Sequence, residues 1–80
     1  MTPITTTAFE DLVREHHAAA YRAALRVTER PEDAADAVQQ AFVVALEQGE
    51  RLLACEQPER VLKWLAVKQA LMILRGERRR

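Results

Sequence analysis

Four carboxylates stand close together in the sequence, at Glu29, Glu32, Asp33 and Asp36. Side chains three or four residues apart share one face of a helix, so this cluster could supply paired catalytic acids or metal ligands. No histidine lies nearby, and a hard cation needs more converging oxygen atoms than one helical turn offers. Acidic side chains are also favoured at the positive end of a helix. We therefore interpret the cluster as the charged start of a helix, and we expect neither a metal site nor a cofactor.

The residues needed for nucleophilic catalysis are missing or isolated. The chain has no serine and no glycine-rich phosphate loop, and Cys55 is its only cysteine, with no base close to it in sequence. His16 and His17 are adjacent, so a helix would point them about 100° apart and they could not bind one zinc ion together. We expect His16 at the edge of the core. The sequence therefore argues against an enzyme.

A third group combines cations with an aromatic ring in the C-terminal part of the chain. It consists of Lys63, Trp64, Lys68, Arg75, Arg78, Arg79 and Arg80. Cations beside an exposed aromatic side chain suit single-stranded nucleic acid, because the cations track phosphates while the ring stacks on a base. The alternative is that Trp64 belongs to the core and that the arginines form a solvated tail. Taken alone, the local pattern slightly favours this alternative.

The composition predicts an all-α protein that positions these groups on helices. The chain has 80 residues, 49% of them hydrophobic, and its two glycines and three prolines leave little room for hairpins. We expect a flexible lead over residues 1–6 and one domain over residues 7–80. This domain is predicted to be a compact bundle of three main helices, at about residues 7–28, 31–48 and 58–76. No secretory leader and no apolar run of roughly 18–20 residues is visible, so we expect a cytoplasmic protein.

The helix predicted over residues 31–48 has two different faces. Pro31 suits the first helical position, and Gly49 follows the last one. Apolar residues at helical spacing predict a buried stripe of Ala34, Val38, Ala41, Phe42 and Ala45. The residues that lie away from this stripe are Asp36, Gln39, Gln40 and Val43. We expect this outer face to carry function, because the core does not need its pattern.

The helix predicted over residues 58–76 is apolar on two stripes. One stripe contains Val61 or Leu62, Leu65, Met72 and Ile73, and the other contains Trp64, Val67, Leu71 and Leu74. A bundle of three helices does not easily cover one helix on all sides, so one stripe is available for a partner. In the linker before this helix, Leu52 and Leu53 are expected to tuck under the chain.

Three motifs follow one another along these segments. Phe9 to His16 matches the pattern F-x-x-L-x-x-x-[YH], and Asp33 to Phe42 resembles the pattern D-A-E-D-L-V-Q-E-x-F. A Trp-Leu pair at Trp64 then opens a helix that ends in an arginine run. Together they resemble region 2 of bacterial RNA polymerase sigma factors of the extracytoplasmic-function (ECF) group. The resemblance covers about residues 8–80, and its middle motif is the most specific.

The resemblance implies a transcription initiation factor domain with two binding surfaces. It implies that the second helix binds the clamp helices of the largest subunit of core RNA polymerase through Asp36, Gln39, Gln40 and Phe42. It implies that the third helix contacts the −10 promoter element and helps to hold the melted non-template strand. The DNA-binding positions would then be Lys63, Trp64, Lys68, Arg75, Arg78, Arg79 and Arg80.

The chain also departs from the family pattern. Ala35 stands where the motif has glutamate, and Met72 and Ile73 replace polar residues. The segment from Trp64 to Arg75 is shorter than the family's by nearly one helical turn. These differences leave open a degenerate module that binds the polymerase or an anti-sigma factor without reading DNA. A further alternative is an unrelated helical domain that self-associates through Trp64, Val67, Leu71 and Leu74.

Overall fold

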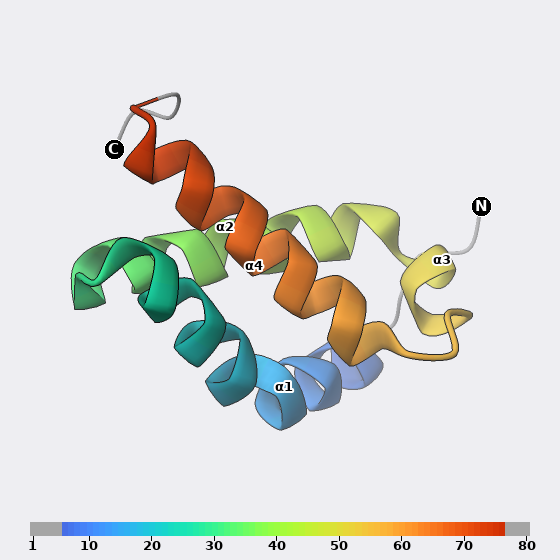
Figure 1. Cartoon of the computed structure of the whole chain (residues 1–80). Coiled ribbons are helices and arrows are strands. Elements are labelled where there is room, and N and C mark those ends of the chain that lie inside the picture. Colours follow the sequence, from blue (N-terminus) through green and yellow to red (C-terminus); the bar gives the residue numbers. More distant parts are fainter. Residues whose placement is uncertain (1–5, 77–80) are drawn as a thin grey trace.

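The computed structural model describes residues 6–76, apart from the side chains of residues 6, 7, 50 and 53, and the fold over this range is all-α (Figure 1). The helices are α1 (Thr6–Thr28), α2 (Pro31–Gln48), α3 (Glu50–Leu53) and α4 (Pro58–Leu74). No strand occurs in the described part of the chain. The three long helices pack on one another, which confirms the predicted bundle of three main helices.

The bounds of α2 agree with the sequence prediction, because both of its ends carry strong signals. Pro31 occupies the first turn, where its missing N–H costs no hydrogen bond. Gly49 ends the helix with a φ of 55°, and its N–H donates to the carbonyl oxygens of Ala45 and Leu46. A positive φ carries little steric cost only for glycine, so the helix stops here.

The other two long helices differ from the prediction by one or two residues at one end. α1 begins at Thr6, which therefore belongs to the helix and not to the expected lead; residues 1–5 of that lead lie outside the described range. α4 ends at Leu74 and does not reach residue 76. Gly76 has a φ of 73°, and its N–H bonds back to the carbonyl oxygen of Ile73, which closes the last turn early.

The connections between the long helices are short and ordered by local hydrogen bonds. Between α1 and α2, the Arg30 N–H donates to the buried Thr28 hydroxyl oxygen at 3.3 Å. Glu29 takes a left-handed φ of 58°, which is uncommon for a residue with a Cβ. After α2, the linker contains the short helix α3, which the sequence pattern did not predict. Leu52 is only 3% exposed there, as expected, whereas the side chain of Leu53 lies outside the described set.

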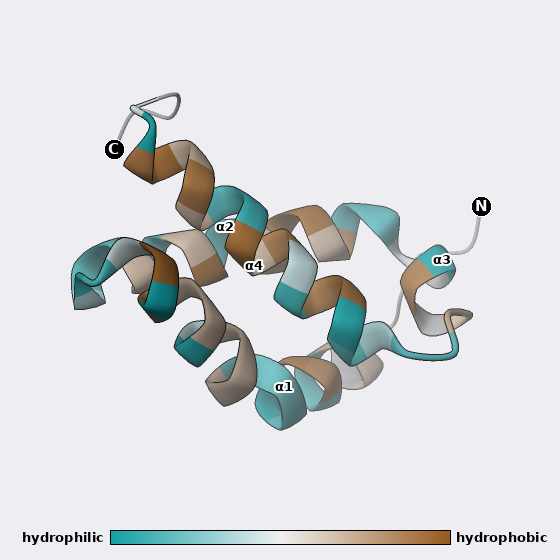
Figure 2. Cartoon of the chain, viewed as in Figure 1, coloured by the Kyte–Doolittle hydropathy of each residue, from teal (hydrophilic) through white to brown (hydrophobic). Residues whose placement is uncertain are grey.

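The core lies where the apolar stripes of the three long helices meet. α2 contributes Ala34, Ala37, Val38, Ala41, Phe42 and Ala45, so the stripe predicted for this helix is buried. Small alanine side chains let neighbouring helices approach closely, and larger side chains then fill the remaining space. Leu62 of α4 and Val38 are the largest fully buried side chains among the described residues. Apolar and polar bands alternate along α4 in Figure 2, and two of its apolar side chains, Trp64 and Leu74, are more than half exposed and so lie outside the core.

Candidate functional site

The outer face of α2 carries the polar residues that the sequence pattern placed there. Gln39 is exposed, and Asp36 and Gln40 are half-buried. Val43, one turn further along, is 45% exposed. These residues recur at steps of three and four, so they form one continuous strip along the helix. We call Asp36, Gln39, Gln40, Val43 and Leu46 the α2 outer face.

Leu46 is the member of this face that the sequence analysis missed. Its side chain is 49% exposed, although leucine is usually buried in a domain core. It follows Val43 by three residues, so extending the outer series by one more step would have found it. Two neighbouring exposed apolar side chains at the C-terminal end of α2 give this face an apolar part next to its polar part.

Phe42 does not belong to the exposed surface. Only 8% of it is accessible, and its ring meets the edge of the Phe9 ring with centroids 6.4 Å apart. The His17 ring stacks on Phe42 at 5.8 Å, nearly parallel, and also stacks on Tyr21. Phe42 therefore fixes α2 against α1 by packing, and it can contribute to binding only by holding the outer face in position.

The outer stripe of α4 combines an exposed aromatic ring with cations. Trp64 is 60% exposed, which excludes the alternative that it belongs to the core. The Lys68 ammonium lies 5.2 Å from the centroid of its ring, in a cation–π contact. Lys63 and Arg75 are also exposed, and Leu74 at the end of the helix is 61% exposed. Arg78, Arg79 and Arg80 lie outside the described residues.

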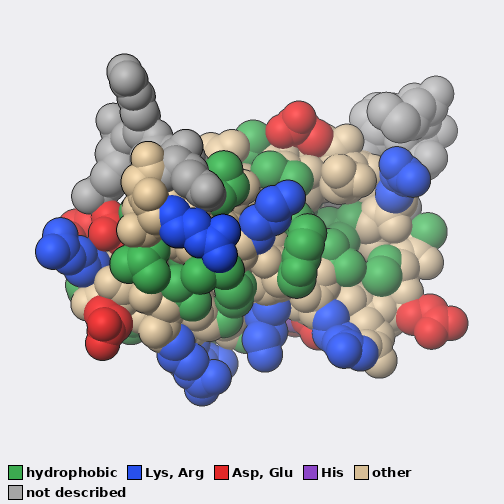
Figure 3. Space-filling model, turned by 45° about the horizontal axis from the view of Figure 1, so that its top comes forward, with side chains coloured by type: hydrophobic (Ala, Val, Ile, Leu, Met, Phe, Trp, Pro, Cys, Tyr) green, Lys and Arg blue, Asp and Glu red, His purple; other side chains and the backbone are tan. Residues whose placement is uncertain are grey.

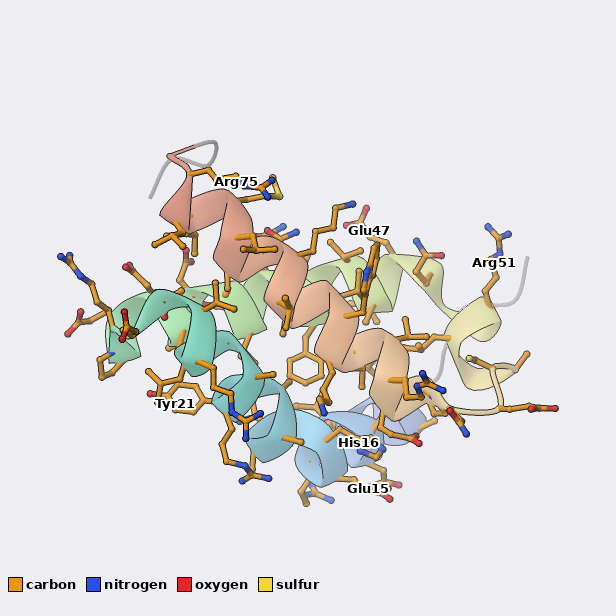
Figure 4. All side chains as sticks on the ribbon, in the orientation of Figure 1. Glu15, His16, Tyr21, Glu47, Arg51 and Arg75 are labelled. Atoms are coloured by element: carbon orange, nitrogen blue, oxygen red, sulfur yellow. The ribbon has the colours of Figure 1, made fainter. Side chains whose placement is uncertain are left out.

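Figure 3 views the molecule with the top of Figure 1 turned forward. Blue lysine and arginine side chains lie across the middle of this face among green apolar ones, and most of the visible acidic side chains lie near its edges. Figure 4 shows Arg75 at the C-terminal end of α4, on the opposite side of the molecule from Glu15 and His16 on α1. A basic and apolar surface of this kind is suited to binding a nucleic-acid strand, because cations attract phosphates and a flat ring stacks on a base.

A hollow of about 300 Å³ opens beside Trp64, between α3 and the first turns of α4. Its lining includes Leu52, Val61 and Leu65 on the apolar side and Arg51 with Gln48 on the polar side. Cys55 also borders it and is half-buried. The hollow is therefore an apolar recess with polar groups at its margin, next to an exposed aromatic ring.

The acidic cluster behaves as the start of a helix. Glu32 and Asp33 occupy the first turn of α2, and Asp33 is buried. No group of histidine, cysteine, aspartate and glutamate side chains within residues 6–76 is arranged to hold a metal ion. His16 is half-buried at the edge of the core, as predicted from its place on the apolar stripe. None of the helices described here is long and apolar enough to cross a membrane.

Comparison with known protein families matches residues 12–80 to the sigma-70 region 2 family. The chain belongs to the sigma-70 region 2 family. Region 2 is the part of a sigma factor involved in RNA polymerase binding and promoter recognition, and it is a transcription factor domain. The match extends from the middle of the first predicted motif to the end of the chain. The comparisons with curated proteins and with solved structures gave no match.

Proposed function

We propose that this sigma region 2 domain is of the ECF type and binds core RNA polymerase through the α2 outer face. The clamp helices of the largest polymerase subunit are the proposed partner surface. α4 and the linker before it contact the −10 promoter element and hold the non-template strand. This role puts the protein in the bacterial cytoplasm, together with the polymerase. The observation that carries the proposal is the accessible strip of Asp36, Gln39, Gln40 and Val43, in which Gln39 and Val43 are exposed and Asp36 and Gln40 are half-buried, on a chain of this family.

The composition of the α2 outer face supports a protein partner. Interfaces between proteins combine an apolar centre with polar groups that form hydrogen bonds around it. Val43 and Leu46 supply apolar area, and the amides of Gln39 and Gln40 can both donate and accept hydrogen bonds. The opposite side of α2 is packed against α1 and α4, so the strip is held on a rigid element.

The outer stripe of α4 supports a nucleic-acid partner. The Trp64 side chain is 60% exposed although Lys68 lies over its ring, and it lines the apolar hollow. An unpaired base could stack there while Lys63, Lys68 and Arg75 neutralise phosphates of the same strand. Melted DNA presents such unpaired bases, whereas duplex DNA does not.

The test of polymerase binding compares charge and contact variants on α2 with a matched variant on α1. The wild-type chain is expected to capture core RNA polymerase in a pull-down. Gln39→Ala should weaken this binding roughly tenfold, or about 1.4 kcal/mol, because a central position on the docking face places Gln39 in the minority of interface side chains whose truncation costs more than about 1 kcal/mol. Asp36→Arg should weaken this binding at least as much, since the new positive charge would face a partner surface that complements a negative one.

The control is Asp11→Arg, the same charge reversal on the outer side of α1. Asp11 is exposed and forms a surface ion pair with Arg14 at 3.2 Å, and such pairs contribute little to stability, so the variant should fold and bind normally. Failure of the wild-type chain to bind, or equal binding by both α2 variants and the control, would contradict the proposed docking face.

A second candidate function follows from the apolar residues of the α4 stripe. Trp64 and Leu74 are each more than half exposed, and such side chains also suit a protein partner. The domain would then bind the polymerase or an anti-sigma factor through α4 without reading DNA. The salt dependence of DNA binding separates the two functions, because phosphate contacts weaken steeply as salt is added.

A further inference from the structure

A separate basic groove lies between α1 and α4. It has a volume of about 160 Å³ and is lined by Ala19, Arg22, Ala23, Arg26 and Lys63. Arg22 and Arg26 are four residues apart, so they project from the same face of α1. Lys63 comes from α4 and completes a set of three cations around two alanines. Blue side chains are visible along the lower part of Figure 3 as well as across its middle.

None of these three cations forms an ion pair or a side-chain hydrogen bond with another residue of the described range. Two other exposed arginines do have local partners: Arg14 pairs with Asp11, and the Arg60 guanidinium donates to the Gln57 side-chain oxygen Oε1 at 3.0 Å. Like charges on adjacent turns repel one another, so the fold gains nothing from keeping Arg22 and Arg26 together. An anion bound between them would remove this repulsion.

The shape and lining of the groove favour phosphate over a protein surface. A guanidinium group offers a planar fork of N–H donors that matches two oxygens of one phosphate. The alanines leave room at the floor, and the lining has no large apolar side chain to anchor a protein partner.

The charges around the groove also indicate in which direction a bound chain of phosphates would continue. On its other side, Arg22 and Arg26 border a second hollow that ends at Glu29, whose carboxylate repels phosphate. A chain of phosphates would therefore run from the arginine pair to Lys63 and continue along α4.

We propose that Arg22, Arg26 and Lys63 bind the backbone phosphates of a nucleic-acid strand and extend the DNA path of α4 onto α1. The inference rests on the proposed function, because it takes the strand held by α4 as its ligand. Lys63 is the shared residue, since it belongs both to the α4 stripe and to the groove. Contacts of this kind add affinity without sequence preference.

The experiment measures binding of a short fluorescein-labelled single strand by fluorescence anisotropy, over about 50 to 200 mM salt. The variant Arg22→Gln/Arg26→Gln should bind roughly fivefold to tenfold more weakly, by a similar factor for a −10 sequence and a scrambled one. The slope of log affinity against log salt should become shallower by about 1.4, since each neutralised phosphate of a single strand contributes about 0.7. The matched control, Arg14→Gln/Arg60→Gln, removes the same two charges from sites with local partners and should change neither quantity comparably.

Three results would overturn the inference. If the groove variant binds the strand like the control while Trp64→Ala weakens binding, the groove is not on the DNA path, although the proposed function stands. If the groove variant keeps DNA binding but loses polymerase in the pull-down, the groove receives an acidic protein surface. If inorganic phosphate displaces the strand from the wild-type chain when its concentration only equals that of the strand's own phosphate groups, the site binds free phosphate and not a nucleic-acid backbone. Thermal unfolding of each variant, followed by circular dichroism, checks that these exposed substitutions leave the fold intact.

Discussion

Replacement of Leu62 by alanine is expected to lower the free energy of unfolding by about 3 kcal/mol, within the range of about 2–5 kcal/mol that truncation of a buried leucine costs. The Leu62 side chain is 1% exposed and lies on the side of α4 that faces the core. Truncation removes apolar contacts and leaves a cavity that the surrounding helices fill only in part. Small domains have little stability to spare, so much of the population should unfold at moderate temperature.

Urea denaturation of the wild type and of Leu62→Ala measures this difference. The matched control is Leu74→Ala, the same substitution on the same helix at a side chain that is 61% exposed. The control should change stability by less than about 0.5 kcal/mol, because little apolar area is lost from the interior. Equal losses for the two variants would mean that α4 does not pack through the stripe containing Leu62.

Replacement of Trp64 by alanine is expected to weaken binding of a single-stranded −10 oligonucleotide by roughly ten- to a hundredfold, since stacking of one base on an aromatic ring contributes about 1–3 kcal/mol. The ring is 60% exposed, so this loss should come with little change in stability. Lys68 lies over the ring and would lose its cation–π partner in the same variant. Anisotropy titrations with the oligonucleotide measure the effect.

The control for Trp64→Ala is Trp64→Phe, which keeps an aromatic face on α4 and should retain part of the affinity. Duplex DNA of the same sequence should bind more weakly than the single strand, because its bases are not available for stacking. Unchanged binding by Trp64→Ala, or binding of the wild type that does not weaken with salt, would contradict the nucleic-acid role of α4 and favour the second candidate function.

The sequence predicted both ends of α2 correctly, but it placed the end of α4 too late and did not predict α3. Each difference has a physical reason. Pro31 and Gly49 fix the two ends of α2 by backbone conformations that few other residues favour. The end of α4 was placed too late, since Gly76 turns the chain just after Arg75. The four-residue helix α3 lacks enough residues to show a helical period in the sequence.

The candidate site was predictable only where one helix determines it. Asp36, Gln39 and Val43 follow from the period of α2 alone. The exposure of Trp64 did not, because both stripes of α4 are apolar and only packing against α1 and α2 decides which one is buried. The groove between α1 and α4 depends on the tertiary fold, which brings Lys63 close to two arginines far away in sequence.

The central claim is that the α2 outer face contacts core RNA polymerase, and photo-crosslinking tests it most directly. A benzophenone side chain at position 39 in place of Gln39, in a chain mixed with core polymerase and irradiated, should become joined to the largest polymerase subunit. The same side chain at position 14 in place of Arg14, exposed on α1, should give little product. Crosslinking from position 14 that equals or exceeds crosslinking from position 39 would contradict the claim.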